Sequence, residues 1–190
     1  MLASGSSGAA LGTTAAITVN SGGTLQLGAD NQIKDTAGIT LNGGTFVKGN
    51  FNEGSASAVG IGALTLSASG SHINFGTGTV GILTFASLNA NAFTLTIDNW
   101  TGNYAQVGNS GTDRLIFNSD QASNLNNFFF TGYGAGGIEF NLGGGFWEVV
   151  AAVPEPSTWF MGSLGLAAIA GSIARRALKR RKYRCLAARF

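Results

Sequence analysis

The sequence predicts an all-β protein: a parallel β-helix, or β-solenoid, followed by a single C-terminal transmembrane helix. Two observations lead to this fold class. Short stretches of alternating apolar and polar residues recur with glycine-rich turns between them, and an uncharged segment near the C-terminus is followed by a basic run. Hydrophobic residues make up 44% of the chain and charged residues 11%, a balance typical of packed rather than disordered protein.

The repeat is clearest near the start of the chain. Residues 17–27 read Ile-Thr-Val-Asn-Ser-Gly-Gly-Thr-Leu-Gln-Leu and residues 39–47 read Ile-Thr-Leu-Asn-Gly-Gly-Thr-Phe-Val, so one plan returns after 22 positions. Each copy has two short alternating strands, which bury one face, and a glycine pair that supplies the turn. A repeat of about this length predicts a solenoid whose coils pair with their neighbours. Looser copies follow at residues 64–67, 73–75, 82–85 and 93–97.

Glycine pairs also occur in the hairpins of antiparallel sandwiches, which remain the alternative architecture for this body. The Gly-Gly-Thr-Leu unit at residues 22–25 resembles the β-strand repeat of autotransporter-type passenger regions. That resemblance favours the parallel solenoid over the sandwich.

Aromatic residues gather in the last part of the body. We expect residues 98–150 to cap the solenoid, because the last coil has no successor to cover its apolar interior. Trp100 and Tyr104 have a second interpretation as candidate carbohydrate contacts, since exposed rings stack on sugars. The aromatic set of this region is Trp100, Tyr104, Phe117, Phe128, Phe129, Phe130, Phe140, Phe146 and Trp147.

The sequence offers little for catalysis or metal binding. One cysteine and one histidine exclude Cys-rich and His-rich metal sites, and the carboxylates follow no spacing that would pair an acid with a base. Asp113 and Arg114 are adjacent and are interpreted as a local ion pair. His72 alternates with Ile73 and is expected on the outer face of its strand. We therefore expect no enzymatic activity, no metal site and no cofactor.

Charge is divided sharply along the chain. Nine acidic residues and only three basic ones fall within residues 1–155, a net charge of −6, whereas residues 175–190 hold eight basic residues. The basic run alone would suit nucleic acid, but an acidic body gives phosphates no support. We expect no nucleic-acid partner.

Between the body and the basic run lies an uncharged segment, residues 159–174. With Ser157 and Thr158 it would form a helix of roughly 27 Å, just long enough to cross a bilayer core. A buried core helix is the alternative, but Trp159 at one end and basic residues at the other are typical of a membrane span. Because basic residues follow this segment, we expect the C-terminus to lie in the cytoplasm and the body to lie outside the cytoplasm. The residues that would stop the span are Arg175, Arg176, Lys179, Arg180, Arg181 and Lys182.

The two prolines of the chain bracket one glutamate directly before this segment, as Pro154, Glu155 and Pro156. Both prolines favour extended backbone at this point of the chain. A Pro-Glu-Pro element, a short apolar helix and a closing arginine-rich cluster together resemble the PEP-CTERM sorting signal of Gram-negative bacteria. The resemblance implies recognition by an exosortase, a membrane-embedded processing enzyme, and a secreted or envelope-associated product often tied to extracellular polysaccharide.

These observations predict a cell-surface structural protein, sorted by an exosortase and associated with polysaccharide or biofilm matrix. A carbohydrate-binding adhesin is the first alternative, and a polysaccharide-cleaving β-helix enzyme is the second. The first ten residues lack the basic and apolar regions of a signal peptide, so we expect a longer repeat protein with further coils upstream. The expected parts are a solenoid body at 1–150, a linker with the Pro-Glu-Pro element at 151–158, the helix at 159–174 and a basic cytoplasmic tail at 175–190.

Overall fold

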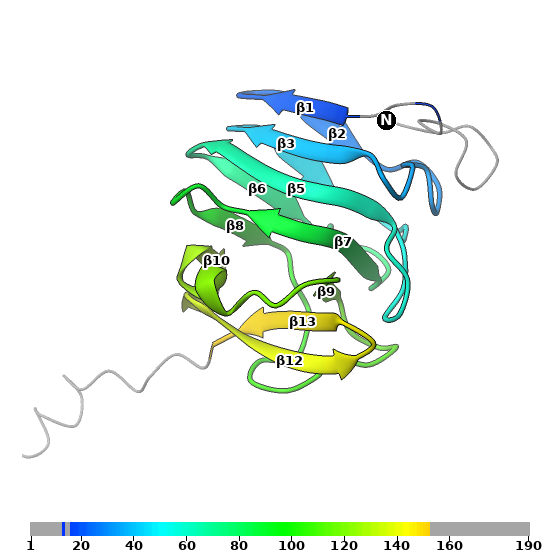
Figure 1. Cartoon of the computed structure of the whole chain (residues 1–190), viewed down its shortest axis with the longest axis vertical. Coiled ribbons are helices and arrows are strands. Elements are labelled where there is room, and N and C mark those ends of the chain that lie inside the picture. Colours follow the sequence, from blue (N-terminus) through cyan, green and yellow to red (C-terminus); the bar gives the residue numbers. More distant parts are fainter. Residues whose placement is uncertain (1–12, 14–15, 153–190) are drawn as a thin grey trace, which may run out of the picture. The chain divides into compact units, whose positions relative to one another are not determined.

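The computed structural model describes Thr13 and residues 16–152. The chain divides into two units, Met1–Val153 and Pro154–Phe190, and the described residues lie in the first. Strands stack on one another along this unit, and from β1 to β10 successive strands of the chain alternate between two sheets (Figure 1). This connectivity is that of a β-solenoid, as predicted.

The first sheet has seven strands in the order β1-β3-β5-β7-β9-β13-β12. Its first five members are parallel, and β13 and β12 are antiparallel to their neighbours. The strands are β1 (Ala16–Asn20), β3 (Gly38–Asn42), β5 (Ile61–Ala68), β7 (Ile82–Asn89), β9 (Arg114–Phe117), β12 (Gly137–Gly143) and β13 (Phe146–Ala151).

The second sheet has six strands in the order β11-β10-β8-β6-β4-β2. It is parallel from β2 to β10, and β11 is antiparallel to β10. A 3-10 helix, η1 (Ala122–Asn127), leads into β10. The strands are β2 (Thr24–Gln26), β4 (Thr45–Val47), β6 (Ser71–Asn74), β8 (Leu95–Asp98), β10 (Phe128–Phe130) and β11 (Gly134–Ala135).

Strand register confirms the repeat found in the sequence. Ile17 stands opposite Ile39 in a parallel pair, and the side chains of Asn42 and Asn20, 22 residues apart, share a hydrogen bond of 3.0 Å. Because the stacked neighbours are parallel, the antiparallel sandwich alternative is wrong for this part of the chain. The likeness to autotransporter-type repeats stays a prediction.

Apolar columns fill the space between the two sheets. Phe46, Ile73, Ile97 and Phe130 stand in register on successive strands of the six-stranded sheet, and all four are fully buried. Phe85 of the facing sheet meets Phe46 edge-on, with ring centroids 6.3 Å apart. Each coil therefore buries its apolar side chains against the coils before and after it.

The glycine pairs lie in turns between strands, as the sequence predicts. Gly22 and Gly43 occupy equivalent corners, between β1 and β2 and between β3 and β4, and both have a φ of 75°. A side chain is strained in that left-handed region, so glycine is the residue that suits both corners. At Gly44 a Cβ atom would lie 2.6 Å from the Val19 carbonyl oxygen, so the close stacking of coils also excludes side chains there.

The stack changes character at its C-terminal end. The antiparallel strands β13 and β12 extend one sheet and β11 extends the other. Phe117 and Phe128 from the two sheets pack with ring centroids 6.2 Å apart, and Phe146 of β13 is 8% exposed. Aromatic rings thus fill the interior where the parallel coils end.

No helix among Thr13 and residues 16–152 combines the length and apolar character needed to cross a membrane. The helix predicted at residues 159–174, the Pro-Glu-Pro element and the basic run lie outside the described residues.

Candidate functional site

The outward side chains of the six-stranded sheet form two columns that cross its parallel strands. Side chains alternate between faces along a strand, and register carries each outward position to the next strand. We call these side chains the outer face. The first column is Thr24, Thr45, His72, Thr96 and Phe129, and the second is Gln26, Val47, Asn74, Asp98 and Thr131, the last placed by its bond to Asp98.

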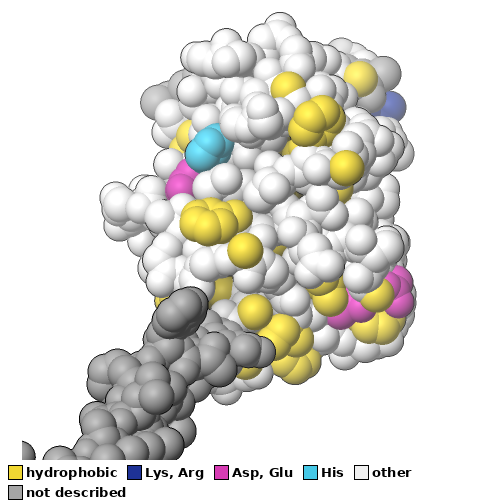
Figure 2. Space-filling model, turned by 90° about the vertical axis from the view of Figure 1, so that its left-hand side faces the viewer, with side chains coloured by type: hydrophobic (Ala, Val, Ile, Leu, Met, Phe, Trp, Pro, Cys, Tyr) yellow, Lys and Arg dark blue, Asp and Glu magenta, His cyan; other side chains and the backbone are white. Residues whose placement is uncertain are grey.

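A short chain of hydrogen bonds links the two columns. His72 Nδ1 lies 2.7 Å from Asp98 Oδ2, and the Thr131 hydroxyl donates to Asp98 Oδ1 at 2.6 Å. The His72 side chain is 36% exposed, so it points outward as the alternation predicts. Figure 2 shows the single histidine beside an acidic side chain, on a face where few side chains are charged. Asp98 thus holds the imidazole ring through Nδ1, and the ring stays partly exposed to solvent.

Phe129 is the exposed aromatic member of the outer face. It lies between Phe128 and Phe130, which are fully buried, and is itself 40% exposed. Its partner in the first column is Thr96. An exposed phenyl ring among threonine and amide side chains is the unusual feature of this surface, since such rings are normally buried.

The structure separates the two aromatic residues proposed as carbohydrate contacts. Trp100 is only 4% exposed and packs on Phe130 and Tyr133, with ring centroids 4.9 and 5.5 Å away. Tyr104 is 53% exposed, and its ring lies 6.2 Å from that of Tyr133. The expectation is corrected for Trp100, because a ring buried in the core cannot stack on a sugar. Tyr104 still offers its ring to solvent.

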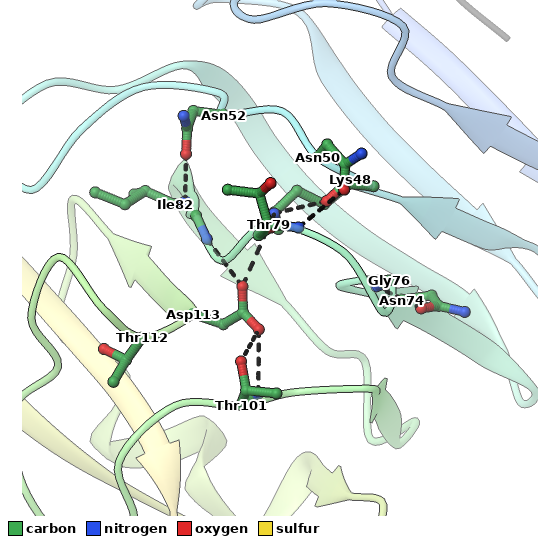
Figure 3. A network of polar contacts seen from close by, with 12 residues as sticks. Lys48, Asn50, Asn52, Asn74, Gly76, Thr79, Ile82, Thr101, Thr112 and Asp113 are labelled. Carbon is green, nitrogen blue, oxygen red and sulfur yellow. Dashed lines mark hydrogen bonds and ion pairs between the residues drawn. The ribbon is translucent and has the colours of Figure 1, made fainter.

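A buried polar network connects the turns on the strandless side of the coils (Figure 3). Lys48, directly after β4, has a fully buried side chain whose Nζ donates to the carbonyl oxygens of Gly49 at 2.7 Å and Thr79 at 3.0 Å. The same Nζ lies 3.8 Å from Asp113 Oδ1 and 5.9 Å from the centre of the Phe75 ring. Burial lowers the pKa of Lys48, and the Asp113 charge opposes that effect.

Asp113 is the acceptor at the centre of this network. Its Oδ1 accepts from Gly81 N–H at 2.9 Å, and its Oδ2 accepts from the Thr101 N–H at 3.1 Å and hydroxyl at 2.6 Å. These donors satisfy a carboxylate that is almost wholly removed from water. The network therefore ties the turn after β4 to the turns before β7 and β9.

Arg114 does not pair with Asp113, so that prediction is wrong. Arg114 instead donates from both Nε and Nη2 to one oxygen, Glu148 Oε2, at 3.1 and 2.7 Å. Neighbouring residues of an extended chain point to opposite sides, which sends the two charges to different partners. The Arg114 pair joins β9 to β13, within the C-terminal end of the stack.

Glu53 is a buried carboxyl of a different kind. Its Oε1 accepts the backbone N–H groups of Gln32 at 2.5 Å and Ile33 at 3.2 Å, while its Oε2 is buried without a hydrogen-bond partner. Burial raises the pKa of Glu53 to about 8; the two N–H donors oppose this, and the charges of Asp35 and Asp30 add to it. The side chain is therefore largely protonated at neutral pH and connects two coils as a neutral group.

In the described part of the chain, no three His, Cys, Asp or Glu side chains are grouped in a way that suits a metal ion. The sequence interpretation missed Lys48 and Glu53, and it counted Phe129 among the rings of the cap without seeing that this ring is exposed. Alternation within Phe128-Phe129-Phe130 is a signal that would have placed the middle ring outside. Nothing local marks Lys48 or Glu53, because Thr79 and Asp113, and Gln32 and Ile33, come from other coils.

The outer face and the buried network are both properties of the solenoid, whereas the comparison with known families concerns the segment that follows it. Residues 152–181 match the PEP-CTERM protein-sorting motif. No curated protein and no solved structure matches the chain. The chain therefore carries a PEP-CTERM sorting motif directly after β13, the last strand of the described residues, which marks it as a cell-envelope or extracellular protein handled by an exosortase-type system.

Proposed function

We propose that the chain is a structural protein of the cell surface, with its solenoid outside the cell and its C-terminal segment serving as a sorting device. The observation that carries this proposal is the sorting motif at residues 152–181, which begins immediately after β13 ends at Ala151. With no intervening domain, whatever the motif delivers is the solenoid itself.

The anchoring step rests on the sequence of the motif. Our proposal assigns the anchor to the uncharged residues 159–174, which the sequence predicts to cross the membrane, with Arg175 and Arg176 on the cytoplasmic side. It assigns recognition by the exosortase to Pro154, Glu155 and Pro156 on the outer side. In this proposal the helix is a transient anchor, and cleavage near the Pro-Glu-Pro element releases the body to the envelope or the exterior.

We propose a structural rather than a catalytic role for the body. Its buried carboxyl groups bond to other groups of the fold: Asp113 to Gly81 and Thr101, Glu148 to Arg114, and Glu53 through one oxygen to two backbone N–H groups. A glycan-cleaving enzyme needs an acid and a base free to meet substrate in one groove. These contacts favour the structural role, and the cleaving enzyme remains the weaker alternative.

Association with extracellular polysaccharide completes the proposal. The described surface offers many uncharged hydrogen-bonding groups, as the face in Figure 2 illustrates. The second candidate function, a carbohydrate-binding adhesin, is favoured by the exposed rings of Tyr104 and Phe129. The two candidates differ in whether contact with polysaccharide is specific.

The intact mass of the protein recovered from its own host tests the sorting proposal. We expect loss of the segment that follows the Pro-Glu-Pro element in a wild-type strain and an unprocessed chain in a strain without exosortase. Glu155→Ala should reproduce the unprocessed mass, whereas Ser157→Ala, two positions away, serves as the matched control. An unprocessed chain in both strains would contradict transient anchoring and leave a permanent membrane anchor.

A further inference from the structure

We propose that the outer face of the six-stranded sheet is a binding surface for a neutral polysaccharide, with Phe129 as its stacking residue. This inference rests on the proposed function, which places the solenoid outside the cell near polysaccharide. It assigns the contact with polysaccharide to particular side chains. The surface consists of the two columns defined above, which run from β2 to Thr131.

The first argument is the charge of the outer face. Apart from His72, its one ionisable side chain is Asp98, and that carboxylate is already engaged by His72 and Thr131. The remaining members carry hydroxyl, amide, isopropyl or phenyl groups. A surface without free charge suits a ligand without charge, and it gives an acidic glycan no cationic partner. The surface therefore selects a neutral polymer over an anionic one.

The second argument is chemical. Sugars present hydroxyl groups around a ring whose C–H faces are apolar, so their binding surfaces combine short polar side chains with an aromatic ring. The first column has this combination, because Phe129 follows Thr96, His72 and Thr45 in register. His72 Nδ1 is held by Asp98, which leaves Nε2 to meet a hydroxyl group.

The third argument is the shape of the surface. Neighbouring strands lie about 4.8 Å apart, so each column repeats its side chains at that interval along the stack. A linear polymer lying along the first column meets a hydrogen-bonding side chain on each of β2, β4, β6 and β8 and then the phenyl ring of Phe129 on β10. A compact ligand would use only one or two of these groups, so the repeat favours an extended chain.

Isothermal titration calorimetry tests this inference on the full chain, purified in a mild detergent. The neutral probes are cellohexaose and chitohexaose, and an alginate oligosaccharide is the anionic comparison. We expect binding to at least one neutral probe and at least tenfold weaker binding to alginate. Phe129→Ala should weaken neutral binding at least tenfold, and Thr96→Lys, which places a long charged chain in the middle of the column, should do the same.

Val107→Ala is the matched control, since Val107 is also apolar and 42% exposed but lies outside the outer face. It should bind as the parent does.

Thermal unfolding of each variant separates lost binding from lost folding, and Phe129→Ala is expected to fold because its ring is partly in solvent. No binding to any neutral probe, preferential binding to alginate, or equal binding by the folded Phe129→Ala and parent chains would overturn the inference. Each of those results would leave the sorting proposal intact, because intact mass in the host tests that proposal separately.

Discussion

The two sides of each coil are held together by different interactions. On the sheet sides, apolar residues such as Phe46, Ile73 and Ile97 stack in register, so each coil repeats the same kind of apolar contact. On the strandless side, Lys48 and Glu53 bind particular atoms of other coils, and no repeat connects them. The columns give the solenoid its general stability, whereas the buried polar contacts fix how individual turns fit together.

The largest effect is expected where a buried charge loses its partner. Asp113→Ala removes the acceptor of Gly81 and Thr101 and leaves Lys48 unpaired in the interior, at a cost of about 3–5 kcal/mol. Urea denaturation measures this loss. Asp120→Ala is the matched control, since Asp120 is exposed and caps one turn only.

The double variant Lys48→Met with Asp113→Leu sharpens the same point. Replacing both charges by apolar side chains removes the desolvation cost of the ions, so it should recover much of the stability lost in Asp113→Ala. If the double variant is less stable than Asp113→Ala, the network contributes chiefly through its many hydrogen bonds, and the ion pair is secondary.

The next effect concerns pH and Glu53. A carboxyl whose pKa rises from 4.5 to about 8 on folding keeps its proton in the folded state while the unfolded chain loses it. Its contribution to stability is complete below about pH 4.5 and is lost as the pH rises through 8, a change on the order of a few kcal/mol.

Glu53→Gln carries no titrating group and retains an acceptor for Gln32 and Ile33. Between pH 5 and pH 9, the unfolding free energy of the parent should therefore fall relative to that of this variant. Denaturation at several pH values measures the difference. A constant difference across this range would show that Glu53 does not titrate differently in the folded and unfolded chains.

A smaller effect is expected within an apolar column. Ile73→Val removes one methylene from a fully buried position and should cost about 1 kcal/mol. The neighbouring columns keep their register, so the strands stay paired. Val47→Ala on the outer face, which removes partly exposed apolar surface, is the control and should cost less; equal costs would contradict the contrast between inner and outer positions.

The smallest effect is expected on the outer face. Asp98→Asn keeps oxygen and nitrogen atoms beside His72 and Thr131 and removes one partly exposed charge. The change in unfolding free energy should stay within about 0.5 kcal/mol, because exposed ion pairs contribute little. A loss as large as that of Asp113→Ala would show that this contact is structural rather than part of a binding surface.

The two sides of the coil also differ in how far the sequence predicts them. Alternation placed Ile73 inward and His72 outward, because a strand has only two faces and the repeat fixes which one is buried. The partner of Lys48 was not predictable, since Thr79 and Asp113 come from later turns whose stacking depends on loop lengths. Trp100 lies in a segment without alternation, and its burial follows from the rings of Phe130 and Tyr133 that surround it.

The position of β13 has a mechanical consequence. Any tension carried by the C-terminal segment enters the solenoid at Ala151, the last residue of a strand that is hydrogen-bonded to β12 on one side and β9 on the other. A pull along β13 loads both ladders in shear, so their hydrogen bonds must yield together instead of opening one after another. The described strand nearest the sorting motif is thus held on both sides, so a pull on it is opposed by two neighbouring strands.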